Sequence, residues 1–166
     1  MRLLPYDRQS AVAYARTWAL SRNPAYYDFS DLGGDCTNFA SQAVYAGAGV
    51  MNVTPVTGWF YRTANDRTAS WTGVEFFYDF LSKNLSAGPF GRWAALSEIR
   101  PGDVIQLSFD GERFAHTPVA LSVGDPPAPE NILVAAHTND ALDRPLSTYA
   151  FRRLRPIHIE GVRQWD

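Results

Sequence analysis

The sequence predicts an α+β fold, with helices in the first half of the chain packed on an antiparallel meander of strands in the second half. Apolar residues recur at helical spacing in the first half, and their period changes to two after Pro101-Gly102. With 166 residues, 46% of them hydrophobic, the chain can bury a sizeable core without a disulfide or a metal. We therefore expect one domain that spans residues 1–166.

The first predicted helix covers residues 7–20. Ala11 and Ala15 fall on one of its faces, and Asp7 is in position to cap its N-terminus. Pro24 follows, and the residue before a proline disfavours the helical conformation. The helix is therefore expected to end before this point.

The second predicted helix runs from Asp35 to Ala46, directly after a loop that ends in Gly33-Gly34. Its apolar residues share faces at helical spacing, and Gly47 and Gly49 supply a C-terminal stop. This assignment places Cys36 in the first turn of a helix.

A third helix is predicted over residues 72–84, with Ser70 near its cap. Phe76, Phe80 and Leu81 are expected to face inward. Gly88-Pro89 then breaks the helical pattern.

Strands are expected after Pro101-Gly102. Asp110-Gly111 is a turn signal, Pro118 indicates an edge or a bulge, and a Pro-rich tip covers residues 125–129. The expected strands cover residues 103–109, 116–123, 132–138 and 151–159.

Charge and cysteine content exclude several classes of protein. The net charge is −2 with both signs mixed, which gives no electrostatic case for nucleic acid or an anionic membrane surface. No run approaches the ~20 apolar residues of a membrane span, so no membrane insertion is expected. A single cysteine permits no intrachain disulfide, and it leaves the cellular compartment open. The basic cluster Arg152, Arg153 and Arg155 is interpreted as solvated or locally paired.

The cysteine is the first candidate for chemistry. A thiol in the first turn of a helix lies where unpaired N–H groups and the helix dipole favour negative charge. Both effects lower the pKa of a thiol, and the thiolate is its reactive form. The glycines before Cys36 also allow a substrate to approach closely.

His116 is the second candidate. If the tip between the second and third strands is centred near Pro127, His116 lies opposite Thr138. The neighbouring His137, Asn139 and Asp140 are polar groups that could orient an imidazole through its other nitrogen. The sequence thus offers a nucleophile, a base and an orienting residue, the logic of a catalytic triad. A cysteine at a helix N-terminus with these partners on adjacent strands is the papain-like arrangement.

Several segments resemble the bacterial putative amidase domain family. The most specific is the run Gly33-Gly34-Asp35-Cys36-Thr37-Asn38-Phe39-Ala40-Ser41-Gln42-Ala43. The resemblance covers nearly the whole chain and implies a cysteine amide hydrolase. Further matching segments are Tyr6-Asp7-Arg8, Arg22-Asn23-Pro24, Ser70-Trp71-Thr72-Gly73, Pro101-Gly102-Asp103-Val104-Ile105-Gln106-Leu107, His116-Thr117, Ala135-Ala136-His137-Thr138 and Ile157-His158-Ile159.

More distantly, the chain is similar to NlpC-type and CHAP-type cell-wall peptidases, in which a Pro-Gly-Asp turn opens the strand before the one that carries the catalytic histidine. This resemblance implies Cys36 as nucleophile and His116 as base. His137 best matches the third residue, with Asn139 and Asp140 as close rivals. The segment between Cys36 and His116 is longer than in compact NlpC-type domains, so their substrate rules do not transfer directly.

Other polar residues have narrower expected roles. Asp35 is expected to cap the second helix through its carboxylate rather than to contact substrate. Tyr27, or its neighbour Tyr26, could supply a side-chain donor to an oxyanion, although packing is the commoner role of such tyrosines. His158 is interpreted as structural because its neighbours are apolar.

No cofactor is expected. Cys36, His116 and His137 could ligate zinc, but the chain has no Cys-x-x-Cys or His-Glu-x-x-His spacing, and a triad accounts for them equally well. Gly-rich phosphate loops and a Gly-x-Ser-x-Gly elbow are absent. Most of the aromatic residues Trp59, Phe60, Trp71 and Trp93 are expected in the core, and one or two of them could form a substrate subsite.

The sequence therefore supports two hypotheses. In the first, the chain hydrolyses amides of a peptide-like substrate through a thioester, with bacterial cell-wall peptide as the first candidate. Acyl transfer to another acceptor would use the same residues. In the second, the papain-like scaffold is a non-catalytic module that binds peptide or glycan. Localisation stays open, because the chain has no signal peptide pattern but could be a domain of a longer secreted protein.

Overall fold

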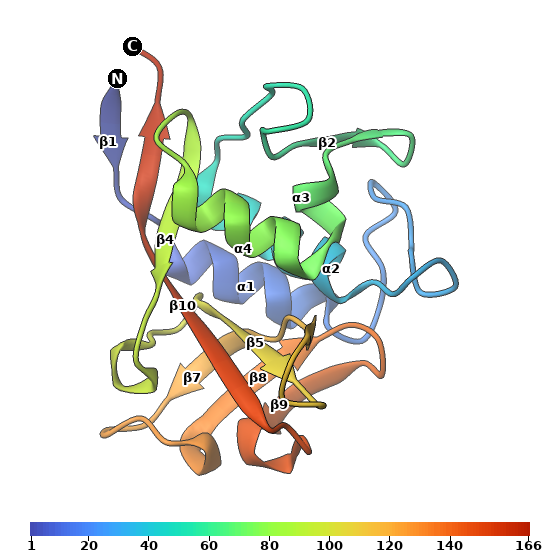
Figure 1. Cartoon of the computed structure of the whole chain (residues 1–166), viewed down its shortest axis with the longest axis vertical. Helices are drawn as coiled ribbons and strands as arrows, with labels where there is room; N and C mark the ends of the chain where they lie inside the picture. The colour runs from blue at the N-terminus through green and yellow to red at the C-terminus, as the bar shows by residue number, and fades with distance from the viewer.

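The computed structural model describes all 166 residues and confirms the α+β class. The long helices come first, and most strands of an antiparallel sheet follow (Figure 1). The helices are α1 (Arg8–Trp18), α2 (Cys36–Ala48), α3 (Ala69–Thr72) and α4 (Val74–Lys83). The strands are β1 (Arg2–Leu4), β2 (Tyr61–Thr63), β3 (Asp66–Arg67), β4 (Gly88–Trp93), β5 (Val104–Ser108), β6 (Phe114–His116), β7 (Val119–Val123), β8 (Ile132–Ala136), β9 (Ala141–Pro145) and β10 (Arg153–Gln164).

The first two helices follow the prediction closely. The side chain of Asp7 accepts a hydrogen bond from the backbone N–H of Ser10, which confirms the predicted cap of α1. Helix α2 begins at Cys36 and ends at Gly49, whose positive φ of 69° suits a glycine C-cap. Gly47 lies inside α2, where a Cβ atom would come within 2.6 Å of the Tyr6 ring. Its role is close packing rather than termination.

The third predicted helix is divided in two at Gly73. The inward positions Phe80 and Leu81 are confirmed, but the prediction for Phe76 is wrong because its side chain is 60% exposed. Phe77 takes the buried position instead. The break at Gly73 sets the phase of α4 independently of the residues before it.

The main sheet is antiparallel throughout and has the strand order β1-β10-β5-β7-β8-β9, with β4 also paired to β10 and β6 to β5. Strand β10 is the long diagonal strand of Figure 1, and it connects both halves of the sheet. β7 pairs with β8 so that Val119 faces Ala135. This is the predicted register, in which His116 comes level with Thr138.

Other strand predictions need correction. The expected single strand over residues 116–123 is interrupted at Thr117-Pro118, so that β6 ends at His116 and β7 starts at Val119. Proline has no N–H to continue the ladder, which accounts for the break. Gly88-Pro89 lies beyond the end of α4, as predicted for a helix breaker, but it also begins strand β4, which was not predicted. Strand β9 and the short strands β1, β2 and β3 were not predicted.

The sheet carries hydrophobic residues on both faces. The larger cluster fills the space between the sheet and α1, α2 and α4, and includes Trp59 and Trp71. A smaller cluster on the opposite face includes Ile105, Leu107 and Ile132. Adjacent residues such as Val104 and Ile105 belong to different clusters, as the alternation of a strand requires.

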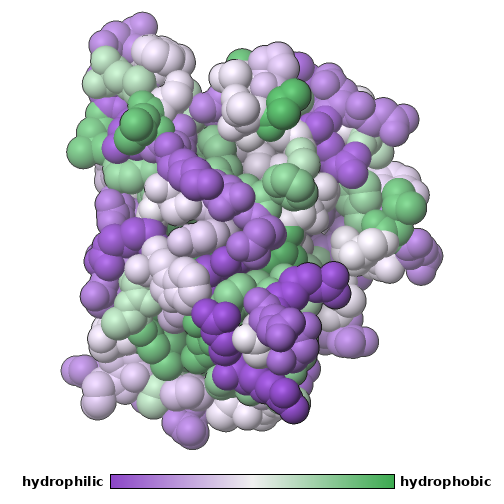
Figure 2. Space-filling model, viewed as in Figure 1, coloured by the Kyte–Doolittle hydropathy of each residue, from purple (hydrophilic) through white to green (hydrophobic).

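The chain termini lie side by side at the outer edge of the sheet (Figure 1), where the N-terminal amine of Met1 contacts the Asp166 carboxylate at 2.6 Å. Figure 2 shows apolar and polar residues interleaved over this face of the molecule. None of the helices combines the length and the apolar character needed to cross a bilayer.

Candidate active site

Cys36 is the first residue of α2 and follows a loop with left-handed glycines. Gly33 and Gly34 have φ values of 87° and 101°, which side chains rarely adopt and which turn the chain sharply into the helix. The Cys36 side chain is buried, at 8% exposed, and its Sγ lies 3.8 Å from Thr37 Oγ1. The predicted position of the thiol in the first helical turn is therefore confirmed.

Burial raises the pKa of the Cys36 thiol, and hydrogen bonds from Thr37 and from the backbone of Thr117 oppose the rise only in part. The expectation that the helix N-terminus would lower this pKa is therefore wrong. The free-energy cost of removing the thiolate from water exceeds the stabilisation that the N–H groups of the first helical turn give to it. The resting cysteine is therefore a protonated thiol at neutral pH.

His116 ends strand β6 and is also buried, at 7% exposed. Burial, with a smaller contribution from the positive charge of Arg144, lowers the pKa of His116 to about 4. The imidazole is thus neutral at pH 7 and has a free lone pair, as a general base needs. Its ring packs against Tyr149, with ring centroids 5.5 Å apart, and makes no hydrogen bond to Cys36.

A pair of threonines joins the two candidate residues. Thr37 follows Cys36, Thr117 follows His116, and their hydroxyl oxygens lie 3.0 Å apart. Both hydroxyls are buried, and Gln106 lies 3.4 Å from that of Thr117. The contact ties the start of α2 to the end of β6, so the thiol and the imidazole belong to neighbouring segments.

His137 lies beneath the loop that precedes Cys36, and its side chain is 1% exposed. Its Nδ1 lies 2.5 Å from Asp35 Oδ2, and its Nε2 donates to the carbonyl of Trp18 at 2.8 Å. The ring stacks on Phe39 with centroids 4.0 Å apart. Both ring nitrogens are therefore occupied by acceptors, and neither is directed to His116.

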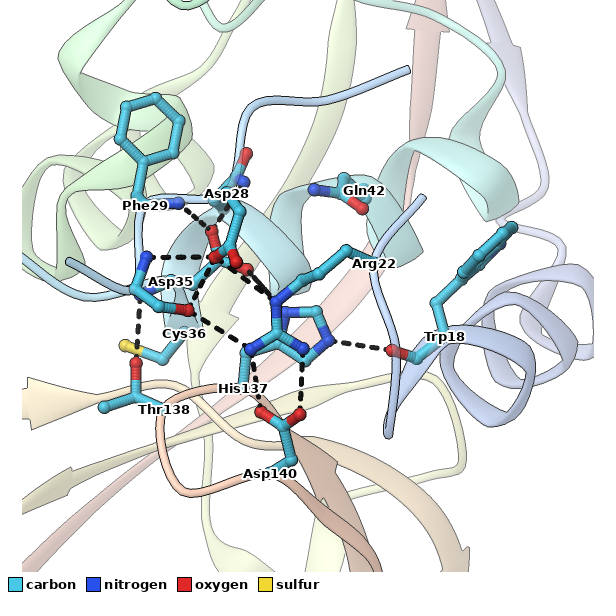
Figure 3. A network of polar contacts seen from close by, with 12 residues as sticks. Trp18, Arg22, Asp28, Phe29, Asp35, Cys36, Gln42, His137, Thr138 and Asp140 are labelled. Carbon is cyan, nitrogen blue, oxygen red and sulfur yellow. Dashed lines mark hydrogen bonds and ion pairs between the residues drawn. The ribbon is translucent and has the colours of Figure 1, made fainter. Parts of the chain in front are cut away.

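The carboxylate of Asp35 does not cap α2, so the predicted capping role is wrong. One oxygen accepts hydrogen bonds from the Phe29 N–H at 2.8 Å and from Asn38 Nδ2 at 2.9 Å, and the other contacts His137. Figure 3 shows these contacts converging on Asp35, with Cys36 beside it and the sulfur outside the network. Asp35 is 1% exposed and fixes the loop rather than facing a substrate.

Arg22 closes the network from the side of α1. It forms a bidentate ion pair with the carboxylate of Asp140, with N–O distances of 2.8 and 3.0 Å, and its Nε lies 3.2 Å from Asp28 Oδ1. The pKa of Arg22 is raised, and its hydrogen bond to Asp140 is the main cause. Because Asp140 is held by this guanidinium, it is not free to orient His116.

The turn between β8 and β9 carries two residues in the left-handed region. Thr138 and Asn139 have φ values of 61° and 59°, an unusual conformation for a β-branched threonine. Thr138 Oγ1 accepts the N–H of Asp35 at 2.9 Å, so the turn is attached to the start of α2. Asn139 is exposed and lines the same cavity as His116.

Two hollows flank β6. A cavity of about 310 Å³ contains His116 and is lined by Phe109, Ala115, Thr138, Asn139, Arg144, Tyr149 and Ala150. On the other side, a groove of about 810 Å³ is lined by Gly33, the first turn of α4, Trp93, Arg113, Phe114 and Arg153. Trp93 is 43% exposed, whereas Trp59 and Trp71 are in the core.

Tyr27 and His158 lie outside both hollows. The side chain of Tyr27 is 50% exposed and packs edge-on against Phe29. His158 Nδ1 lies 2.9 Å from the buried carboxylate of Asp103, as a structural histidine would. In the basic cluster, Arg155 is locally paired, as predicted, through its two contacts with Glu75 at 2.7 and 2.8 Å.

Sequence reasoning assigned no role at the site to Arg22, Arg144 or Tyr149, although Arg22 belongs to one of the segments that resemble the amidase family. Arg22 pairs with Asp140, which lies 118 positions away, and Arg144 and Tyr149 come from β9 and the turn that follows it. Only a prediction of the β8–β9 hairpin could have brought the last two near His116. No three His, Cys, Asp or Glu side chains are grouped as a metal site would require.

The model of the putative amidase domain family matches residues 5–159. The chain belongs to this family. The description of the family points to amide hydrolysis in general.

Among curated proteins, the uncharacterized protein YhbB of Bacillus subtilis (strain 168) matches this chain with 36% identity over 143 residues. The match covers 84% of this chain but 44% of YhbB, so the chain spans less than half the length of that relative. No solved structure matches the chain.

Proposed function

We propose that residues 1–166 form one papain-like amidase domain that hydrolyses amide bonds through Cys36 as nucleophile and His116 as base. The observation that carries the proposal is the 3.0 Å contact between Thr37 and Thr117, the residues that follow the two catalytic candidates. This contact ties the segment that carries a thiol at a helix N-terminus to the segment that carries a neutral imidazole at a strand end. A thiol and a base on neighbouring elements form the unit needed for nucleophilic catalysis.

The reaction starts from a neutral pair. His116 takes the proton of Cys36 as the sulfur attacks the carbonyl carbon, and a carbon–sulfur bond forms while the carbonyl electron pair moves onto oxygen. The pair returns as the carbon–nitrogen bond breaks, and His116 gives its proton to the departing amine. Water, deprotonated by His116, then hydrolyses the thioester and restores the thiol.

The polar residues of the β8–β9 turn have separate roles in this proposal. His137, the residue suggested by resemblance as the third triad member, holds Asp35 and thereby the loop before Cys36. Asn139 lines the cavity of His116 and is the better placed of the three to orient its imidazole. Asp140 neutralises Arg22.

The substrate is proposed to be a peptide-like amide, with bacterial cell-wall peptide as the first candidate. The groove lined by Gly33 and Trp93 gives an extended chain a path from the loop before Cys36 to the exposed face of Trp93. Aromatic side chains supply much of the binding energy at such sites. Trp93 is thus the subsite residue among the tryptophans.

A second candidate function is a non-catalytic module that binds peptide in the same groove. The raised pKa of the Cys36 thiol and the missing hydrogen bond to His116 favour it, because neither describes an activated thiolate. The two functions differ in whether His116 affects the reaction of the thiol with an acyl donor.

The deciding experiment is acylation of Cys36 by p-nitrophenyl acetate at pH 7, followed by release of p-nitrophenolate and by mass spectrometry of the acetylated protein. As an amidase, the wild type reacts far faster than a free thiol of the same pKa, and His116→Ala removes roughly 10²–10⁴-fold of the rate. Cys36→Ser serves as the unreactive control. Equal rates in wild type and His116→Ala would favour the binding module.

A further inference from the structure

The hydroxyl of Tyr149 is buried and has no hydrogen-bond partner within the chain. A buried hydroxyl without a partner costs about 1–3 kcal/mol, so such a group in a native protein calls for an explanation, of which a catalytic role is one. Tyr149 follows the short helical turn Leu146–Thr148 and lines the 310 Å³ cavity that contains His116. A ligand that enters this cavity could supply the missing partner.

Tyr149 is also held in place more firmly than its position in a loop suggests. The guanidinium carbon of Arg144 lies 3.6 Å from the centroid of its ring, and Arg144 itself donates to Thr148 Oγ1 at 2.7 Å and to the Thr148 carbonyl at 3.0 Å. The ring of His116 packs against the phenol from another side. The hydroxyl is thus preorganised, which a donor to a transition state requires.

The electrostatic setting fits a donor rather than an acceptor. Burial raises the pKa of Tyr149, so its proton is present at neutral pH, and the charge of Arg144 opposes part of that rise. A negative charge on Cys36 also raises this pKa, so charge that develops at the nucleophile is felt at the phenol. Arg144 adds positive potential to the cavity that contains His116, which favours negative charge there.

From these observations we propose that Tyr149 Oη donates a hydrogen bond to the carbonyl oxygen of the substrate as that oxygen becomes negative. The inference rests on the proposed amidase function. When the sulfur of Cys36 bonds to the carbonyl carbon, the electron pair displaced onto oxygen is stabilised by the O–H of Tyr149, with Arg144 behind its ring. The pair returns to carbon as the leaving group departs, and Tyr149 keeps its proton throughout.

The proposal assigns to Tyr149 the side-chain donor that the sequence suggested for Tyr27 or Tyr26. Tyr27 is half-exposed and lies outside the cavity of His116. Tyr26 packs in an aromatic group with Tyr61 and Trp71, at centroid distances of 5.0 and 6.0 Å. Tyr27→Phe is therefore a matched control for Tyr149→Phe.

The test compares two reactions of the same sulfur in the full chain. Acylation by p-nitrophenyl acetate passes through an oxyanion, whereas alkylation by iodoacetamide displaces iodide at a saturated carbon and forms none. Tyr149→Phe is expected to slow acylation by about 10²–10³-fold and to change alkylation by less than about twofold, as removal of an oxyanion donor does. Tyr27→Phe is expected to change neither rate.

Three results would overturn the proposal. Unchanged acylation in Tyr149→Phe would mean that the hydroxyl does not act, and an equal loss of acylation and alkylation would assign Tyr149 to the orientation of His116. Since the variant removes only an unpartnered oxygen, its melting temperature should match or exceed that of the wild type, and a fall would indicate a structural role. Arg144→Gln is a second variant, expected to slow acylation selectively by a smaller factor.

The two proposals fail in different ways. If the wild type itself shows no acylation beyond that of a free thiol, the amidase function is wrong and the role of Tyr149 falls with it. If the wild type is acylated in a His116-dependent manner and Tyr149→Phe behaves like the wild type, only the role of Tyr149 is wrong.

Discussion

Asp35 and His137 form a buried pair in which Oδ2 and Nδ1 lie 2.5 Å apart and each side chain is 1% exposed. The other nitrogen of His137 faces a backbone carbonyl, which can only accept. The imidazole of His137 therefore bridges the carboxyl group of Asp35 and the carbonyl of Trp18 inside the protein. It anchors the residue before the candidate nucleophile to the end of α1.

We predict that Asp35→Asn destabilises the fold strongly. The change removes the carboxyl group that contacts His137 Nδ1 in the interior, and removing one partner of a buried ionisable pair costs roughly 3–5 kcal/mol. For a chain of this size the melting temperature should fall by roughly 6–20 °C, as measured by circular dichroism. The control is Asp28→Asn, whose carboxylate is 45% exposed and also contacts Arg22. An equal fall in melting temperature for both variants would mean that the buried pair contributes no more to stability than the exposed one.

His116 gives a second prediction, on acid stability. Its pKa of about 4 lies below the ordinary value of 6.5, so between these pH values the unfolded chain binds a proton that the folded chain does not. Stability is therefore complete above pH 6.5 and is lost as the pH falls to 4, by up to about 3 kcal/mol at ~1.4 kcal/mol per pKa unit.

The measurement is urea unfolding of the wild type and of His116→Gln at pH 7, 5.5 and 4. Because glutamine does not titrate, the variant should lose less stability on acidification than the wild type, and the difference should grow between pH 6.5 and 4. Parallel curves for the two proteins would contradict the lowered pKa.

These two histidines show how far sequence reasoning reaches. The helical period around Cys36 and the centre of the β7–β8 tip are local features, and they correctly predicted the start of α2 and the register that sets His116 level with Thr138. The orientation of a side chain, by contrast, depends on contacts with residues that are distant in the sequence. Nothing near His137 in the sequence indicates that its ring turns toward Asp35, 102 residues earlier.

The missed strands have a similar explanation. β9 reads Ala-Leu-Asp-Arg-Pro, with two of its central residues exposed, and β4 begins with Gly-Pro, so neither shows the apolar alternation of a half-buried strand. Both strands form because a neighbour offers free backbone groups for pairing. Since β9 leads to Arg144 and Tyr149, missing this strand also hid one wall of the cavity around His116.

The third prediction concerns the reactivity of the free thiol. Burial raises the pKa of Cys36, so its alkylation by iodoacetamide should be slow at pH 7 and should increase with a midpoint above the ~8.5 of a free cysteine. Glutathione, measured in parallel, gives the reference curve. A midpoint well below 8.5 that rises in His116→Ala would instead indicate a thiolate–imidazolium pair in the resting protein.

The fourth prediction tests the groove that leads to Trp93. This side chain stands edge-on to Tyr78 and Phe114, with centroids 5.9 and 5.7 Å away, and leaves 43% of its surface exposed to the groove. An acetyl group bound at Cys36 is too short to extend along the groove, whereas a peptide chain can. Trp93→Ala should therefore leave acylation by p-nitrophenyl acetate unchanged.

With a peptide p-nitrophenyl ester, the same variant should lose about tenfold in kcat/KM, since contact with an aromatic side chain contributes on the order of 1.5 kcal/mol and each 1.4 kcal/mol is a factor of ten. Trp165→Ala is the matched control, because Trp165 is 64% exposed and lies outside both hollows. A loss with both esters would place the effect of Trp93 on the catalytic residues themselves. No loss with either ester would mean that the bound peptide does not extend from Cys36 along this groove. The cavity lined by Tyr149 and Arg144 would then be the other pocket beside His116 to test by substitution.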